Sequence, residues 1–361
     1  MATLQFPRRV PSPAQDCVTL RNAFQGSKTN EKAVIQVLAH RNAAQRKIIG
    51  DTYQELYNQS LTDSLNSKLS DDFGSAVILW TYEPVERDAR LVHKALNSKQ
   101  IGMNEVGVII EISYTSSPSH FRAVERCYGS LFKSNFRHDM YKTPEPFILF
   151  WFINPMRYIG TNVDLDSVND DATKLKTAIE SKRIDRFDVA IIFSSRSFFA
   201  LKAIFESYHQ KYGNRISEDI KDSGNDMWES LLKTMIRCIV SPEKHLAEVI
   251  RAATSGTSTD HDSLIRVIVC RAEIDLMKVR EAYLEMIGTS LDNAVERNTS
   301  GNCQAFLMAL KTSYVFAVVA SSSVVAAASC SCISVMKAMK IEASGVAGIL
   351  PAELEERTRG A

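Results

Sequence analysis

The sequence predicts an all-α fold built from four repeats of about five short helices each. A tyrosine recurs at nearly equal spacing, with gaps of 75, 80 and 75 residues, at Tyr53, Tyr128, Tyr208 and Tyr283. Apolar residues follow a helical period within each unit. No segment shows the convincing alternation of apolar and polar residues that marks a strand. A motif that returns at a fixed spacing indicates an internal repeat, so the chain is expected to contain four similar units.

Two further positions recur around each tyrosine. Twelve residues before it stand Arg41, Ser116, Arg196 and Arg271. Eight residues after it stand Leu61, Phe136, Ile216 and Leu291. Four matches at the same offsets are hard to obtain by chance, so the four units share one pattern.

Within the units the apolar spacing is helical. One face of an expected helix carries Val85, Ala89, Val92 and Leu96. A second carries Leu264, Val267 and Ile268. Helix starts are predicted by capping boxes at Thr259 with Asp262 and at Ser60 with Asp63.

The boundary between the second and third units differs from the others. Residues 154–173 are rich in Asn, Asp, Gly and Pro, so we expect a connector that divides the core into two pairs of units. The predicted organisation is an N-terminal segment 1–13, repeats 14–82, 83–155, 156–240 (with the connector) and 241–312, and a C-terminal extension 313–361.

Composition excludes several classes of function. The formal net charge is +1, so no global field favours nucleic acid. The start "MATLQFPRRVPSPAQD" lacks a signal-peptide apolar run, and seven cysteines without pair spacing suggest reduced thiols, so we expect a cytoplasmic protein. The metal, nucleotide and hydrolase signatures are absent, so no enzyme is expected.

The repeats resemble the annexins, and plant annexins in particular. The resemblance rests on "LAHRNAAQRKI" from Leu38, "YEPVERDARLV" from Tyr82, "RVIVCRAEIDL" from Arg266 and "NTSGN" from Asn298, and it covers about residues 10 to 311 in all four repeats. It implies a slightly curved helical disc whose convex face docks on anionic phospholipid through bound calcium. The family's calcium loop is similar to G-x-G-T, with an acidic residue 42 positions after the first glycine.

The chemistry explains that loop pattern. Calcium takes six to eight oxygen ligands. Glycine lets the backbone turn so that several carbonyl oxygens converge on one point. A distant carboxylate then adds negative charge, and water and lipid phosphate complete the shell.

None of the four loops keeps the acidic residue. The first has Gly26 but Lys28 at the second glycine, and Lys68 at the acidic position. In the second, "KQIGMNE", counting back from Phe147 places Lys142 there, with a slip of one residue. The third, "SKRIDR", has no glycine and Ser223 at the acidic position.

The fourth loop is the best preserved. Thr254, Gly256 and Ser258 form a turn that leaves carbonyl oxygens free, and Asn298 stands at the acidic position. Asn298 offers one neutral oxygen, so this vestigial site is expected to bind calcium weakly or not at all. A plain turn before a capped helix is the alternative interpretation.

The lysines in the first two loops allow a second hypothesis. The ammonium groups of Lys28, Lys68 and Lys142 are expected near the family's calcium position, where they would contact a lipid phosphate directly. Such contacts give weak, salt-sensitive adhesion, about 1 kcal/mol each. The alternative is that they are ordinary solvated surface lysines.

Two further residues match positions discussed for plant annexins. His40 matches a histidine connected with peroxidase activity, but nothing else here supplies the redox cofactor, so a cap or packing role is expected. Cys238 matches a cysteine whose partner position holds Tyr114, so buried packing is expected instead of redox chemistry.

The segment after residue 312 departs from the family. Residues 313–336 carry no charge and are long enough to span a bilayer, but small residues and serine make insertion marginal. A weakly ordered or appended tail is the alternative.

Together these features predict a peripheral protein of anionic membranes whose dependence on calcium is weakened or lost. The alternative of another class is a calcium-independent interaction scaffold, for example for cytoskeletal filaments, that retained the disc.

Overall fold

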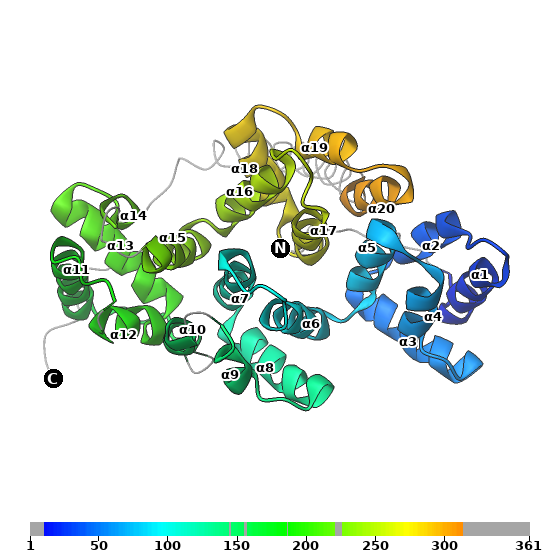
Figure 1. Ribbon diagram of the computed structural model, residues 1–361, viewed down its shortest axis with the longest axis horizontal. Helices are drawn as coiled ribbons and strands as arrows, with labels where there is room; N and C mark the ends of the chain where they lie inside the picture. Colours follow the sequence, from blue (N-terminus) through cyan, green and yellow to red (C-terminus); the bar gives the residue numbers. More distant parts are fainter. Residues whose placement is uncertain (1–10, 144–145, 155–156, 186, 221–225, 313–361) are drawn as a thin grey trace, which may run out of the picture. The chain divides into compact units, whose positions relative to one another are not determined.

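The computed structural model describes residues 11–143, 146–154, 157–185, 187–220 and 226–312. In these residues all regular structure is helical, and each repeat contributes five helices (Figure 1), so the all-α prediction is confirmed. The first repeat comprises α1 (Pro13–Gln25), α2 (Glu31–Leu38), α3 (Ala43–Tyr57), α4 (Leu61–Lys68) and α5 (Asp71–Thr81). The second comprises α6 (Pro84–Leu96), α7 (Met103–Thr115), α8 (Pro118–Phe132), α9 (Phe136–Met140) and α10 (Pro146–Phe152).

The other two repeats follow the same order. The third comprises α11 (Leu165–Glu180), α12 (Phe187–Ser195), α13 (Phe198–Tyr212), α14 (Ile216–Asp219) and α15 (Asp226–Val240). The fourth comprises α16 (Pro242–Thr254), α17 (His261–Arg271), α18 (Leu276–Ile287), α19 (Leu291–Asn298) and α20 (Gly301–Thr312).

The recurring residues hold equivalent places in the four repeats. Each tyrosine lies buried in the third helix of its repeat. The apolar residue eight positions later is the first residue of the fourth helix and is buried in every repeat. Arg41 and Arg196 each bind an aspartate 25 residues earlier, on the first helix of the repeat, at 2.7 Å from Asp16 and 2.6 Å from Asp171. The sequence periods therefore mark the residues that pack each unit.

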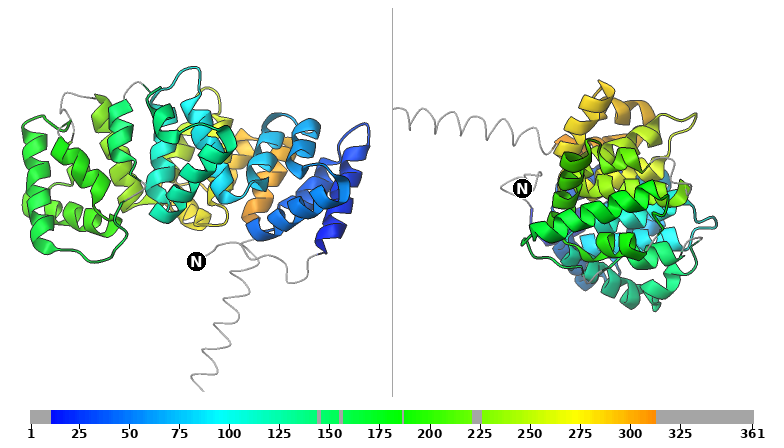
Figure 2. Two further views of the ribbon diagram at one scale, coloured as in Figure 1. Left: turned by 90° about the horizontal axis from the view of Figure 1, so that it is seen from below. Right: turned by 90° about the vertical axis from the view of Figure 1, so that its left-hand side faces the viewer.

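The hydrophobic residues form two cores, and the pairing differs from the prediction. One core joins the first and fourth repeats, and the other joins the second and third, which lie side by side in Figures 1 and 2. The predicted division at residues 154–173 is therefore wrong, because the connector links two repeats that share a core. It is also shorter than predicted: α11 begins at Leu165, where the side chain of Asp164 caps the helix.

One predicted helix start is shifted by one residue. Ser60 caps α4 as expected, by accepting a hydrogen bond from the Asp63 amide. In the fourth repeat, however, the cap of α17 is Asp260, which accepts from the Ser263 amide at 3.1 Å. The hydroxyl of Thr259 contacts the side chain of Asn298 instead.

Charged residues connect the two cores. Glu111 of α7 is buried and accepts a hydrogen bond from Arg266 of α17, with His245 of α16 3.6 Å away. Burial opposes ionisation of Glu111, yet Arg266 and His245 outweigh it and lower the pKa of this carboxyl. The contact between the second and fourth repeats is therefore ionic, and a buried charge left without its partner is costly.

A second buried ion pair joins the first and fourth repeats. Arg46 of α3 is only 1% exposed, lies 2.8 Å from Glu273, and stacks 3.6 Å above the Trp80 ring. We expect Glu273→Ala to lower the free energy of unfolding by about 3–5 kcal/mol, because it leaves the Arg46 guanidinium buried and unpaired. Denaturation by urea measures this loss.

The matched control removes the acid of an exposed pair whose base, Lys47, lies next to Arg46 on α3. Glu83 pairs with Lys47, and both side chains are about half exposed. Glu83→Ala should cost less than about 1 kcal/mol. Equal losses for the two variants would contradict the role given to Glu273.

Candidate calcium and lipid site

The loop of the fourth repeat is held in a defined turn between α16 and α17. The amide of Asp260 donates to the carbonyl oxygen of Ala253 at 2.9 Å, which closes the loop. A Cβ atom on Gly256 would lie 3.1 Å from the oxygen of Ser258, so glycine allows this close approach. The carbonyl oxygens of Gly256 and Ser258 accept no backbone hydrogen bond from any residue that the structure describes.

Asn298 is in contact with this loop. The hydroxyl of Thr259 lies 2.8 Å from Asn298 Oδ1, and Asn298 Nδ2 donates to Ala294 at 2.8 Å. The residue 42 positions after Gly256 therefore lies beside the turn, as the resemblance implies. Thr254 directs its hydroxyl back to Ile250 of its own helix.

The first loop repeats this geometry. The amide of Asn30 donates to Ala23 at 2.9 Å, and a Cβ on Gly26 would lie 2.9 Å from the oxygen of Lys28. The hydroxyl of Thr29 donates to the main-chain oxygen of Lys68 at 3.0 Å. Both loops thus keep the turn and a threonine contact. The contacted residue is Asn298, an amide, in the fourth repeat and Lys68, an amine, in the first.

A small pocket lies beside Lys68. It has a volume of about 170 Å³ and is lined by Arg21, Tyr53, Ser64 and Lys68, among others. Tyr53 is fully buried, and its hydroxyl has no hydrogen-bond partner among the described residues. In the second repeat the equivalent Tyr128 donates to Asp139 at 2.7 Å. Ser64 replaces that aspartate here and instead donates to Ser60, which leaves Tyr53 unpaired.

The register of the second repeat differs from the count that selected Lys142. α4 and α19 begin seven residues before Lys68 and Asn298, and α9 begins seven residues before Thr143. Thr143, not Lys142, therefore stands at the equivalent position, and it is buried. The count was one residue off because Phe147 is not the equivalent of Phe73. Gly102 caps α7 through Glu105.

Lys142 forms an ion pair with Asp139 at 2.8 Å. Burial would raise the pKa of Asp139, but hydrogen bonds from Lys142, Ser134 and Tyr128 outweigh it and lower the pKa from 3.8 to about 2. Lys142 therefore contributes to the packing of its repeat, and its ammonium group is already partnered.

The third loop presents aromatic residues that sequence reasoning missed. Phe187 follows this loop directly as the first residue of α12 and is 57% exposed. Its ring packs edge-on against Trp151 of α10 at 4.8 Å, and Trp151 is 38% exposed. The sequence does show an aromatic run at residues 147–152. It does not show that Trp151 in this run packs against Phe187, because the two residues are distant in sequence. Ser223 lies outside the described residues.

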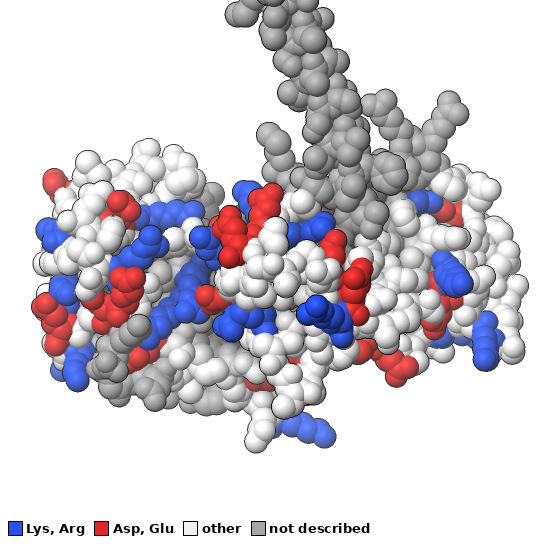
Figure 3. Space-filling view, turned by 90° about the horizontal axis from the view of Figure 1, so that it is seen from above, with Lys and Arg blue, Asp and Glu red and all other residues white. Residues whose placement is uncertain are grey.

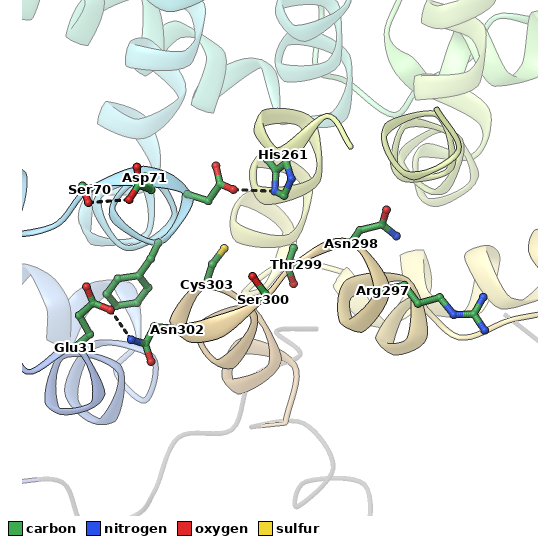
Figure 4. Close-up of a pocket in the computed structure, with 12 residues that line it drawn as sticks. Glu31, Ser70, Asp71, His261, Arg297, Asn298, Thr299, Ser300, Asn302 and Cys303 are labelled. Atoms are coloured by element: carbon green, nitrogen blue, oxygen red, sulfur yellow. Dashed lines mark hydrogen bonds and ion pairs between the residues drawn. The ribbon is translucent and has the colours of Figure 1, made fainter. Parts of the chain in front are cut away.

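A polar pocket of about 430 Å³ separates Asn298 from the carboxylates of the first repeat (Figure 4). Each acid lining it has its own partner: Asp72 pairs with His261 at 2.9 Å, and Glu31 accepts from Asn302. Asp71 accepts from Ser70 at 2.9 Å. The described residues contain no group of three or more His, Cys, Asp or Glu side chains that could hold a metal ion.

These donor sets decide which loops suit calcium. In the first loop Lys68 stands at the sequence position of the carboxylate, and an ammonium group has no lone pair to offer a cation. The fourth loop fits only through neutral oxygens, those of Gly256, Ser258 and Asn298. Neutral oxygens alone predict low affinity.

The other residues that the sequence singled out are Cys238, Tyr114 and His40. Cys238 is buried in the core of the second and third repeats, where burial raises the pKa of its thiol well above the usual value. Tyr114 donates to the carbonyl oxygens of Phe152 and Phe193. His40 follows α2, and its buried Nδ1 has no partner among the described residues.

The uncharged segment 313–336 lies outside the described residues. Among the helices that are described, none is long and apolar enough to cross a membrane.

The low pKa of Asp139 predicts a pH dependence of stability. A carboxyl whose pKa is lowered by folding stabilises the native state above about pH 4, and this contribution is lost as the pH falls toward 2. Asp139→Asn should therefore lower the midpoint of urea denaturation at pH 7 and have a smaller effect at pH 3. The exposed Asp51→Asn serves as the control and should lower the midpoint at pH 7 by less than Asp139→Asn does. A pH-independent difference for Asp139→Asn would contradict the assignment.

Comparison with known proteins agrees with the resemblance seen in the sequence. The annexin family model matches residues 15–80, 170–235 and 245–310, which lie in the first, third and fourth repeats. Annexin D3 of Arabidopsis thaliana is 44% identical over 316 residues, covering 86% of this chain and 98% of the relative. Annexin-like protein RJ4 of Fragaria ananassa is 37% identical with the same coverage.

Solved structures share the fold. Annexin III superposes with a TM-score of 0.78 at 28% identity, covering 86% of this chain and 96% of that one. Calcium-bound annexin (Sm)1 gives a TM-score of 0.72 at 26% identity, covering 83% and 90%. With a family model across three repeats and plant relatives along most of its length, the chain belongs to the annexin family.

Proposed function

We propose that this annexin is a peripheral protein of anionic phospholipid membranes whose dependence on calcium is weakened or lost. Annexins as a family bind phospholipid in a calcium-dependent way. The observation that carries the proposal is the contrast within the first and fourth loops: the turn is retained, but Lys68 and Asn298 replace the carboxylate. No catalytic role is part of this proposal.

In the first repeat, cations take over the contact with lipid phosphate. Lys28 and Lys68 are exposed at the loop, and Arg21 lines the pocket beside Lys68. These three cations suit the oxygens of a phosphate group. Each basic residue near an anionic leaflet contributes about 1 kcal/mol.

The aromatic pair supplies an apolar anchor. Phe187 and Trp151 expose rings next to the third loop, which has no glycine turn of its own. Aromatic side chains favour the interface between lipid headgroups and acyl chains. Together the lysines and these rings support adhesion that is sensitive to salt and insensitive to chelators.

Restoring the carboxylate should restore calcium binding. Asn298→Asp places a negative charge next to a turn that already exists, and an added carboxylate near a cation contributes on the order of 1–4 kcal/mol. We expect calcium affinity, measured by isothermal titration calorimetry, to rise at least about tenfold. Asn293→Asp, on the exposed face of the same helix, adds the same charge without this effect. Similar gains from both variants would contradict a preformed turn.

Co-sedimentation with phosphatidylserine vesicles tests the membrane role. Binding should persist in a calcium chelator and weaken with salt, and Lys68→Glu should reduce it about tenfold or more because the charge near the leaflet is reversed. Lys278→Glu, an exposed charge reversal on α18, should change it less.

Two outcomes contradict the proposal. Binding that requires micromolar calcium would show that the loops still function as calcium sites. Absence of binding both with calcium and with chelator would favour the interaction scaffold over a membrane role.

A further inference from the structure

A second pocket lies where the third repeat meets the start of the fourth. It has a volume of about 600 Å³ and is bordered by α13, α14, α15 and the first turn of α16. Figure 3 shows Lys and Arg side chains gathered in a hollow between these parts of the molecule. It is lined by the basic residues Lys202, His209, Arg215, Arg237, Lys244 and His245 and by the carboxylates of Glu206 and Glu248. None of them belongs to the calcium loops.

The positive charge of this pocket is only partly compensated. Arg237 pairs with Glu248 at 2.7 Å, and Glu206 accepts a hydrogen bond from Gln210. The remaining cations, Lys202, Arg215 and Lys244, form no ion pair with another residue in the part of the chain that the structure describes. Lys202 belongs to α13, Arg215 is the N-cap residue of α14 and Lys244 belongs to α16, so three elements each contribute one cation to the lining. Such an arrangement suits an anion with more than one charged group.

The wall of the pocket adds two further features. The side chain of Ser241 makes no capping hydrogen bond at the start of α16, although Glu243 places a carboxylate in the first turn of that helix. His245 is 8% exposed and lines the pocket, and its buried Nδ1 has no partner among the described residues. A buried polar atom without a partner is unusual and indicates a missing ligand or water.

Apolar side chains form the rest of the lining. Phe205, Ile216 and Ile236 are buried residues of the core that border the pocket. Ligand pockets of about 300–1,000 Å³ combine an apolar lining with a few polar groups that fix orientation. The volume here exceeds what one inorganic phosphate needs, so a carbon body is accommodated as well.

We propose that this pocket binds a small organic phosphate carrying two or more phosphate groups. Lys202, Arg215 and Lys244 contact the phosphates, and the apolar lining contacts the carbon body. The ligand is a soluble one. The pocket lies at the N-terminal end of α16 and the fourth loop follows its C-terminal end, so the 13 residues of this helix separate the two sites by about 20 Å. The choice of a soluble ligand rests on the proposed function, which places the calcium loops, and not this pocket, against the membrane.

Calorimetric titration with inositol hexakisphosphate, without membranes, tests the pocket. The full chain should bind it saturably and bind inorganic phosphate much more weakly. Lys244→Gln and Arg215→Gln should each weaken binding about tenfold, because each removes a charged contact. The exposed Lys278→Gln should leave it unchanged. All three positions are exposed, so the variants are expected to fold.

Specific outcomes overturn the proposal. Absence of binding, or equal losses in Lys244→Gln and Lys278→Gln, would exclude a built site. Binding to vesicles with phosphatidylinositol bisphosphate that depends on Lys244, without binding of the soluble probe, would overturn the choice of a soluble ligand. A chain that binds the soluble probe but no phosphatidylserine vesicle would keep the pocket and lose the proposed membrane role.

Discussion

The buried carboxylate of Glu111 is the ionic contact that links the two apolar cores through the second and fourth repeats. The apolar residues form two separate cores, one for the first and fourth repeats and one for the second and third. Glu111 joins them, because it belongs to α7 and is paired with Arg266 and His245 of the fourth repeat. Removing one partner of such a buried pair is far more damaging than losing an exposed one. The positions of the first and fourth loops, and of the basic pocket that His245 lines, therefore depend on charge pairing as well as on hydrophobic packing.

The shape of the loops does not depend on the calcium ligand. In both the first and the fourth repeat the turn is closed by a backbone hydrogen bond and permitted by one glycine, and a threonine hydroxyl ties it to the last residue of the repeat's fourth helix. In the first repeat that threonine contacts a main-chain oxygen, whereas in the fourth it contacts the side-chain oxygen of Asn298, which stands at the carboxylate position of the family pattern. The carboxylate position can therefore hold an amine or an amide while the turn survives. The closing hydrogen bond and the glycine of the turn are thus retained together with a lysine or an asparagine at the carboxylate position.

Much of the fold follows from the sequence because its periods report local packing. The recurring tyrosines, the apolar residues such as Leu61 that begin each fourth helix, and the position of Asn298 beside its loop were all predictable. Contacts between distant segments were not. The pairing of the first repeat with the fourth, the contact of Phe187 with Trp151 and the basic pocket all join residues whose sequence separation carries no periodic signal. Lys142 was misplaced because a single apolar landmark cannot fix a register to one residue, whereas three helix starts in the structure can.

The central claim is that the loops retain their turn but no longer hold calcium tightly. A crystal structure of the unmodified chain grown in millimolar calcium tests it directly, because ordered ions and their ligands are visible. We predict that the first loop holds no ion and that the fourth holds at most a partly occupied one, bound by the oxygens of Gly256, Ser258 and Asn298. Fully occupied ions with complete oxygen shells in both loops would contradict the account.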